Sequence, residues 1–257
     1  MNQYILNLTS SSEERYLVAH IDELAQKASQ GISMRTGFLD LRQQVLGEAV
    51  VVQYADISWK MYGGFEGAER KRLLLSPEWE YDMDDHIHCI QIKPTDKNET
   101  SLGHRDYLGA IMNLGINREK IGDILVKERE AYVMVDEILS VYLCQQLERV
   151  GHSRVETARI DRKNLIPPKS EPIQINCTIH SLRLDAVLAA ALRISRSEAV
   201  SLIEAGWVQL NHQVIEKGAA SIKAKDLLSI RGKGRICVDE VGDLTKKGRY
   251  RVCLSRW

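Results

Sequence analysis

The sequence lacks the features that would mark an exported, metal-bound or membrane-spanning protein. Its 257 residues include five cysteines, an odd number, and no two of them form a C-x-x-C pair. This spacing is typical of reduced thiols and argues against a disulfide framework and a zinc site. No run of 18 apolar residues exists, and no basic segment followed by an apolar one stands near the first residue. We therefore expect no transmembrane helix, no signal peptide, no membrane partner and a cytoplasmic location.

An excess of charge of one sign is also missing, since 35 Lys and Arg balance 35 Asp and Glu. That balance excludes a basic chain that coats nucleic acid along its whole length, and it excludes an acidic solvating tail. Only two phenylalanines are present, so a surface of stacked aromatics would have to use the nine tyrosines or four tryptophans. With 44% hydrophobic and 27% charged residues, the composition is that of a globular protein long enough for two or three domains.

Prolines are scarce, and three of the five lie together at Pro167, Pro168 and Pro172. Because proline restricts its own backbone and that of the preceding residue, this cluster predicts a linker over residues 163–176. Residues 1–177 carry 21 basic and 27 acidic side chains, whereas residues 178–257 carry 14 basic and 8 acidic ones. The zero net charge is therefore a cancellation of −6 and +6, and the sign asymmetry suggests that the second part meets a polyanion.

Hydrophobic periodicity predicts three folded parts. Residues 86–160 have the order strand, helix, hairpin, helix, strand, which is the β-α-β-β-α-β order of a ferredoxin-like domain. Its elements are expected at 86–92, 104–114, 122–126, 131–135, 135–150 and 154–160. Upstream, a small α/β unit is expected from helices at 13–30 and 39–46 and strands at 49–54 and 72–75.

After the linker, a helix over 183–192 is followed by a capping box at Ser195 and Glu198, which opens a second helix that Gly206 ends. Short strands are then expected at 208–210, 214–215, 226–231, 236–241 and 250–254. Basic residues surround this frame, and Gly232-Lys233-Gly234-Arg235 combines cations with a backbone that a phosphate can approach. Such clustering favours salt-dependent RNA binding, although an ordinary solvated face of charges has the same composition.

The same residues resemble the S-four domain, the small RNA-binding domain named after ribosomal small-subunit protein four. The resemblance rests on Arg183-Leu184-Asp185, Ser195-Arg196-Ser197, Ile203-x-x-Gly206-x-Val208 and residues 226–235. It implies RNA contacts by two helices and the following strand edge. Together with Arg193, which flanks the turn between the helices, the expected RNA-binding residues are Arg183, Arg193, Arg196, Ser197, Lys225, Arg231, Lys233 and Arg235. Asp185 is expected to orient Arg196 or cap its helix, because a carboxylate facing phosphate would repel it.

Three further segments, residues 38–44, 63–72 and 104–124, resemble the YlmH-type proteins, which are bacterial S-four proteins. This resemblance implies binding of structured RNA on the ribosome, at the large subunit with tRNA during rescue of stalled nascent chains, and a link to cell division. The middle domain then resembles an RNA-recognition fold. Its central strand at 130–137 offers only Tyr132 as an aromatic, which argues against base stacking by this sheet. A second RNA-binding patch is expected at Arg70, Lys71, Arg72, Arg105, Arg118 and Lys120, with a plain surface charge network as its alternative.

The sequence offers little support for a catalytic site or a metal-binding site. His104-Arg105-Asp106 lacks the asparagine that a kinase loop needs, since Ile111 stands there. Asp82, Asp84, Asp85, His86 and His88 could ligate a metal, but acid clusters ahead of a strand are more often solvated turns. Arg183-Leu184-Asp185 continues without the motif of a pseudouridine synthase. We expect no catalytic residue, metal or cofactor, and the alternatives are an RNA-modifying enzyme or a protein-interaction adaptor in cell division.

The sequence therefore predicts an α+β protein. Its parts are an N-terminal α/β unit (1–83), a ferredoxin-like RNA-binding domain (84–162), a proline-rich linker (163–176) and an S-four domain (177–257) made of a helix-turn-helix and a small sheet. The expected partners are rRNA, tRNA and the ribosome, with a protein contacting the acidic first part, and the chain is expected to be a monomer. Its role is expected in translation quality control or ribosome assembly.

Overall fold

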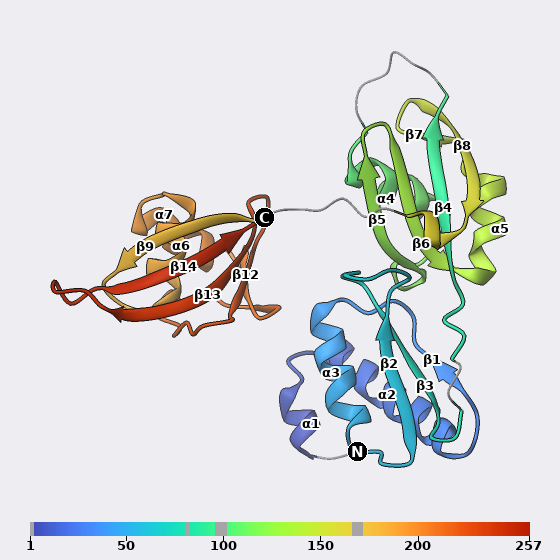
Figure 1. Cartoon of the computed structure of the whole chain (residues 1–257), viewed down its shortest axis with the longest axis horizontal. Coiled ribbons are helices and arrows are strands. Elements are labelled where there is room, and N and C mark those ends of the chain that lie inside the picture. The colour runs from blue at the N-terminus through green and yellow to red at the C-terminus, as the bar shows by residue number, and fades with distance from the viewer. Residues whose placement is uncertain (1–2, 81–82, 96–101, 166–171) are drawn as a thin grey trace. The chain divides into compact units, whose positions relative to one another are not determined.

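The computed structural model describes residues 3–80, 83–95, 102–165 and 172–257. The chain forms two compact units, residues 1–168 and 169–257, and its fold class is α+β as predicted (Figure 1). Among the described residues, no helix is both long enough and apolar enough to cross a membrane.

The first unit begins with three helices and a small antiparallel sheet. The helices are α1 (Gln3–Leu8), α2 (Ser12–Ser29) and α3 (Leu41–Val51), and the strands are β1 (Met34–Arg35), β2 (Ile57–Tyr62) and β3 (Arg72–Pro77), in the order β1-β3-β2. Ser11 caps α2, and Asp40 with Gln43 forms a capping box on α3. The strand predicted at 49–54 is wrong, because Val50 and Val51 are buried on the last turn of α3. Strand β2 was not predicted.

The remainder of the first unit has the predicted ferredoxin-like topology. Its elements are β4 (Ile87–Pro94), α4 (His104–Asn113), β5 (Ile121–Lys127), β6 (Glu130–Asp136), α5 (Glu137–Gln146), β7 (Arg149–Val150) and β8 (Ser153–Ile160), with short 3-10 turns at Arg118–Lys120 and Arg162–Asn164. The strand order β5-β6-β4-β8-β7 is antiparallel throughout. One face of the sheet packs on the helices through a core that includes Ile90, Tyr107 and Leu143.

The other face of this sheet is covered from within the same unit. Ile87, Cys89 and Met134 on this face are buried together with Phe38 from the N-terminal part. Gly122 allows this approach, because a Cβ atom there would lie 2.7 Å from Cε1 of Phe38. The N-terminal part and the ferredoxin-like domain therefore share a core.

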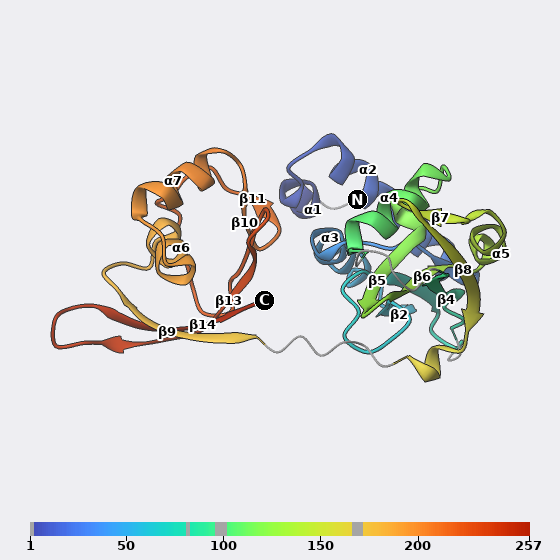
Figure 2. The same cartoon turned by 90° about the horizontal axis from the view of Figure 1, so that it is seen from above.

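The second unit consists of two helices on one side of a six-stranded sheet (Figure 2). Its elements are β9 (Ile173–Ile179), α6 (Leu184–Leu192), α7 (Arg196–Glu204), β10 (Val208–Leu210), β11 (Gln213–Val214), β12 (Leu227–Ile230), β13 (Gly234–Leu244) and β14 (Tyr250–Arg256). The order is β11-β10-β12-β13-β14-β9. Leu188, Ile203 and Leu254 are among the buried residues that join helices to sheet.

Strand β9 begins at Ile173, within the segment predicted as a linker. It pairs with β14 along its whole length, from Ile173 opposite Arg256 to Ile179 opposite Tyr250. Pro167 and Pro168, on which the linker prediction rested, lie outside the described residues.

Candidate nucleic-acid interface

The turn between α6 and α7 follows from two local signals. Helix α6 ends at Leu192, and the next residue, Arg193, adopts the left-handed conformation with φ +55° and reverses the chain. Helix α7 starts at once, because the Ser195 hydroxyl accepts a hydrogen bond from the Glu198 amide at 3.1 Å, as the predicted capping box requires. Arg193 and Arg196 are therefore exposed on either side of a tight turn, and Ser197 lies beside them in the first turn of α7.

A buried carboxylate holds two of the predicted RNA-binding arginines. Asp185 is 2% exposed, and its carboxylate accepts hydrogen bonds from Nη2 of Arg183 at 2.9 Å and from Nη2 of Arg196 at 3.1 Å. Burial by itself raises the pKa of Asp185, but the hydrogen bonds from both arginines outweigh it and hold that pKa below its ordinary value. The expectation that Asp185 orients Arg196 is confirmed, and Asp185 orients Arg183 as well.

This cluster keeps a positive charge that an anion can use. Two guanidinium groups share one carboxylate, and both arginine side chains stay partly exposed. A guanidinium has five N–H donors, so donors remain for the bidentate recognition of a phosphate. Because Asp185 already orders both side chains, such contacts would cost little rotamer entropy.

A second group of cations lies at the turn between β12 and β13. Arg231 and Lys233 are exposed there, and the Lys233 amide donates to the Ile230 carbonyl at 3.0 Å. Gly234 is required by the backbone itself, since its φ is +90° and a Cβ atom would lie 2.1 Å from the carbonyl oxygen of Trp257. Arg235 follows on β13, where its amide donates to that same oxygen at 3.2 Å. The glycines therefore form this turn whether or not a phosphate approaches it.

Lys225 does not join these cations. It precedes β12, whereas Arg231 follows that strand, and its amide donates to the Val238 carbonyl. The four residues of β12, which alone span about 13 Å, lie between the two positions. Sequence reasoning also missed Trp207, an exposed residue whose ring centroid lies 6.0 Å from Cζ of Arg231. Its place beside the basic turn follows from strand pairing and has no local sequence signal.

In the second patch, the RNA contact expected of Arg72 does not fit the structure. Arg72 is 1% exposed, forms an ion pair with Asp136, and donates to the carbonyl oxygens of Asp85 and His86 at 3.1 Å. Its guanidinium also lies 4.9 Å from the ring centroid of Phe38. The contacts with Asp136, Asp85 and His86 join the N-terminal part to the ferredoxin-like domain, so this cation belongs to the core of the first unit.

Arg70 also joins the N-terminal part to the ferredoxin-like domain, whereas the hydrogen bonds of Arg118 stay within the ferredoxin-like domain. Arg70 donates to the carbonyl oxygen of Phe38 at 2.6 Å and to that of Ile121 at 3.1 Å. Arg118 donates to the Ile121 oxygen at 2.6 Å, and burial lowers the pKa of Arg118 to about 10. Of the other members, Lys71 and Lys120 are partly buried, and Arg105 is exposed on α4. The six residues therefore do not form one cationic surface.

The histidines considered as metal ligands make internal contacts. Nδ1 of His86 lies 2.6 Å from Oε2 of Glu137, and Nδ1 of His88 lies 2.9 Å from the Ser140 hydroxyl. Within the described ranges, no three His, Cys, Asp or Glu side chains are grouped to hold a metal ion. Asp82 lies outside the described residues.

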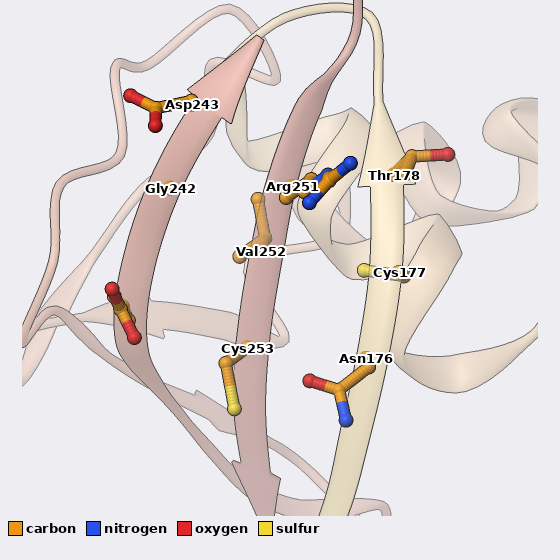
Figure 3. A pocket seen from close by; sticks show the side chains of 9 residues that line it. Asn176, Cys177, Thr178, Gly242, Asp243, Arg251, Val252 and Cys253 are labelled. Atoms are coloured by element: carbon orange, nitrogen blue, oxygen red, sulfur yellow. The ribbon is translucent and has the colours of Figure 1, made fainter. Parts of the chain in front are cut away.

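A polar hollow lies on the face of β9, β14 and β13 that is turned away from the helices (Figure 3). The residues that line it include Asn176, Thr178, Arg251, Cys253 and the two acids Glu240 and Asp243. Two acids against one arginine would repel a phosphate, so this hollow is a poor site for RNA.

Comparisons with known proteins agree with this geometry. Two family models match, one described as "Putative RNA-binding domain in YlmH" at residues 81–164 and one as "S4 domain", the S-four domain, at residues 182–228. A curated Bacillus subtilis protein, "Ribosome-associated protein quality control protein P2", is 36% identical over 223 residues, which are 86% of each chain.

A solved structure, "Cell division protein ylmH from Streptococcus pneumoniae", is also similar. It has 26% identity and a TM-score of 0.52, and the match covers 62% of this chain and 97% of that one. The identity to the Bacillus protein along most of both chains, together with the two matched domains, shows that the chain belongs to the YlmH-type family of RNA-binding proteins with a C-terminal S-four domain.

Proposed function

We propose that the protein binds structured rRNA on the bacterial ribosome, without catalysis, and acts in quality control of translation. The observation that carries the proposal is the cluster of Arg183, Asp185 and Arg196, which presents two ordered guanidinium groups on a part of the chain with a net charge of +6. The name of the Bacillus relative supports the ribosome and quality control. The resemblance of the sequence to the YlmH-type proteins supports binding at the large ribosomal subunit, together with tRNA, in the cytoplasm.

The second unit would dock through phosphates. The arginines of the cluster would each take a phosphate in a bidentate manner, and Arg193 and Lys233 would add further phosphate contacts. Each neutralised phosphate releases condensed counterions, so binding would weaken steeply as salt rises. The protein would act as a monomer, because no step of this docking needs a second copy.

A pair of charge reversals tests the proposal. Arg193→Glu with Lys233→Glu changes two exposed cations of the surface, and neither residue contributes to the ion pairs of Asp185. We expect co-sedimentation with ribosomal subunits at moderate salt to fall at least tenfold, since two phosphate contacts become repulsions.

The matched control is Lys246→Glu with Lys247→Glu. These two exposed lysines lie in the β13–β14 loop, at the opposite end of β13 from Gly234, and their reversal changes the net charge equally. Equal loss of binding in both variants would show that net charge alone matters and would refute the assigned surface.

A protein partner for the first unit is a second candidate function. On α5, the exposed side chains of Ile138, Val141 and Tyr142 follow the spacing i, i+3, i+4 and so form one apolar stripe. The solved relative carries the name of a cell division protein, which supports an adaptor role.

A further inference from the structure

One end of the sheet in the second unit gathers two tryptophans and the basic turn. Val208 pairs with Ile230, Ile230 with Gly234, and Ile236 with Arg256. Trp207 precedes Val208, and Trp257 follows Arg256 at the end of β14, marked C in Figure 1. The turn of residues 231–235 therefore lies between two tryptophans that are 50 positions apart in the sequence. We call Trp207, Trp257 and the turn of residues 231–235 the sheet end.

Both tryptophans are exposed, although hydrophobic residues in the adjoining strands are buried. Trp207 is 45% exposed and Trp257 is 46% exposed, whereas Val208, Ile236 and Leu254 in the adjoining strands are fully buried. An indole that stays half exposed leaves much apolar surface in water, which is the arrangement found where an aromatic side chain meets a partner.

The backbone holds both tryptophans in place. The Trp207 amide donates to the Leu202 carbonyl at 3.1 Å, and the Trp207 carbonyl accepts from the Arg231 amide at 2.9 Å. Trp257 exchanges two hydrogen bonds with Arg235, at 3.0 and 3.2 Å. The rings are therefore carried by ordered backbone, and Arg231 stands over the Trp207 ring as an additional cation.

The charge of the sheet end selects the kind of partner. Residues 227–238 contain Arg231, Lys233 and Arg235 and no acidic residue. Alternating aromatic rings and cations suit a single strand of nucleic acid, because bases stack on the rings while phosphates contact the cations. A paired helix hides its bases and offers only phosphates at such a surface.

We propose that the sheet end binds an unpaired stretch of RNA, with bases stacked on the indoles of Trp207 and Trp257 and phosphates held by Arg231 and Lys233. The inference rests on the proposed function and adds the kind of RNA element recognised, which is a loop, bulge or junction that exposes bases beside a folded helix.

The test compares two RNA probes with the full-length protein. One probe is a blunt duplex, and the other is the same duplex with a short single-stranded extension. The wild-type protein is expected to bind the extended probe about a hundredfold more tightly, since each of the two stacked bases accounts for about tenfold. Trp207→Ala or Trp257→Ala is expected to lose about tenfold of this preference and to keep its affinity for the blunt duplex.

Conservative and matched controls make the result specific. Trp207→Phe keeps an aromatic face and is expected to retain most of the preference. Trp79→Ala removes an exposed tryptophan of the first unit and is expected to change neither affinity.

Three outcomes would overturn the inference. If the wild type binds both probes equally, or if Trp207→Ala weakens both by the same factor, stacking at the sheet end is refuted while the proposed phosphate docking stands. If the wild type binds neither probe, the inference and the proposed function fail together.

Discussion

Asp185 shows how one buried residue can hold two cationic side chains in place. A buried carboxylate costs solvation free energy, and here two charge-assisted hydrogen-bonding partners offset that cost. The backbone supports the same site, since the Asp185 amide donates to the Gly218 carbonyl at 3.1 Å. Without the negative charge of Asp185, the guanidinium groups of Arg183 and Arg196 would repel each other, and both side chains would be less ordered.

Replacement of Asp185 by asparagine gives a pH-dependent prediction. The folded-state pKa of Asp185 is lowered, so its stabilising contribution is complete above its unfolded-state pKa of about 4 and is lost as the pH falls through the folded-state value. We expect Asp185→Asn to lower the unfolding free energy of the second unit by about 2 kcal/mol at pH 7. The difference from wild type should shrink below about pH 4, as measured by urea denaturation at several pH values.

The exposed Asp243→Asn variant serves as the control and should match wild type at each pH. A difference for Asp185→Asn that stays constant from pH 7 to pH 3 would contradict the assigned ion pairs.

At the scale of elements, one face of the ferredoxin-like sheet is buried within the first unit. This is the face on which RNA-recognition folds stack bases. Ile87 and Cys89 on β4 and Met134 on β6 are covered by Phe38. The aromatic Tyr132 lies further along the same face, where its hydroxyl contacts Gln91 and Glu130. A carboxylate beside the ring disfavours a phosphate there, so this sheet is a poor stacking platform.

The corresponding prediction concerns Tyr132. We expect Tyr132→Ala to leave the affinity for RNA within about twofold of wild type, because one stacked base is worth about tenfold or more. Fluorescence anisotropy with the extended RNA probe would measure this, with Trp207→Ala as the variant that should lose affinity. A tenfold loss for Tyr132→Ala would instead assign base stacking to the first unit.

For the whole molecule, charge and compactness divide the chain at nearly the same place. The compact units separate between residues 168 and 169. Residues 169–177 contain one lysine and one glutamate, so the units carry the same net charges, −6 and +6, as the segments divided at residue 177. A chain divided in this way can contact RNA with one unit and keep the other free for a different partner.

Separate expression of the two units tests this division. We expect residues 169–257 alone to unfold cooperatively and to retain RNA affinity within about threefold, with a salt dependence close to that of the full chain, since the slope counts phosphate contacts. Residues 1–168 alone should not co-sediment with ribosomal subunits, and a pull-down should recover protein through the α5 stripe. Ribosome binding by the first unit would contradict the division.

The sequence by itself determined much of the local structure. The helices α2, α6 and α7, the capping box at Ser195 and the β-α-β-β-α-β order follow from periodicity and capping, which act within a few residues. The sequence motifs also indicated the family, and the residue counts showed the charge asymmetry between the two parts of the chain. The alternation of Ile173, Ile175, Cys177 and Ile179 indicates a strand, although the nearby prolines favour a linker over its first residues.

Only the tertiary structure decided which charged and aromatic side chains face water. Arg72 looks like Arg231 in the sequence, yet it is buried because Asp136, 64 residues away, pairs with it. Trp207 and Trp257 lie at the same end of the sheet only because β10, β12, β13 and β14 are neighbours in it. A polar group can be buried only where hydrogen bonds or an opposite charge compensate its loss of water. These partners come from distant parts of the sequence, so no local sequence pattern shows which polar groups are buried.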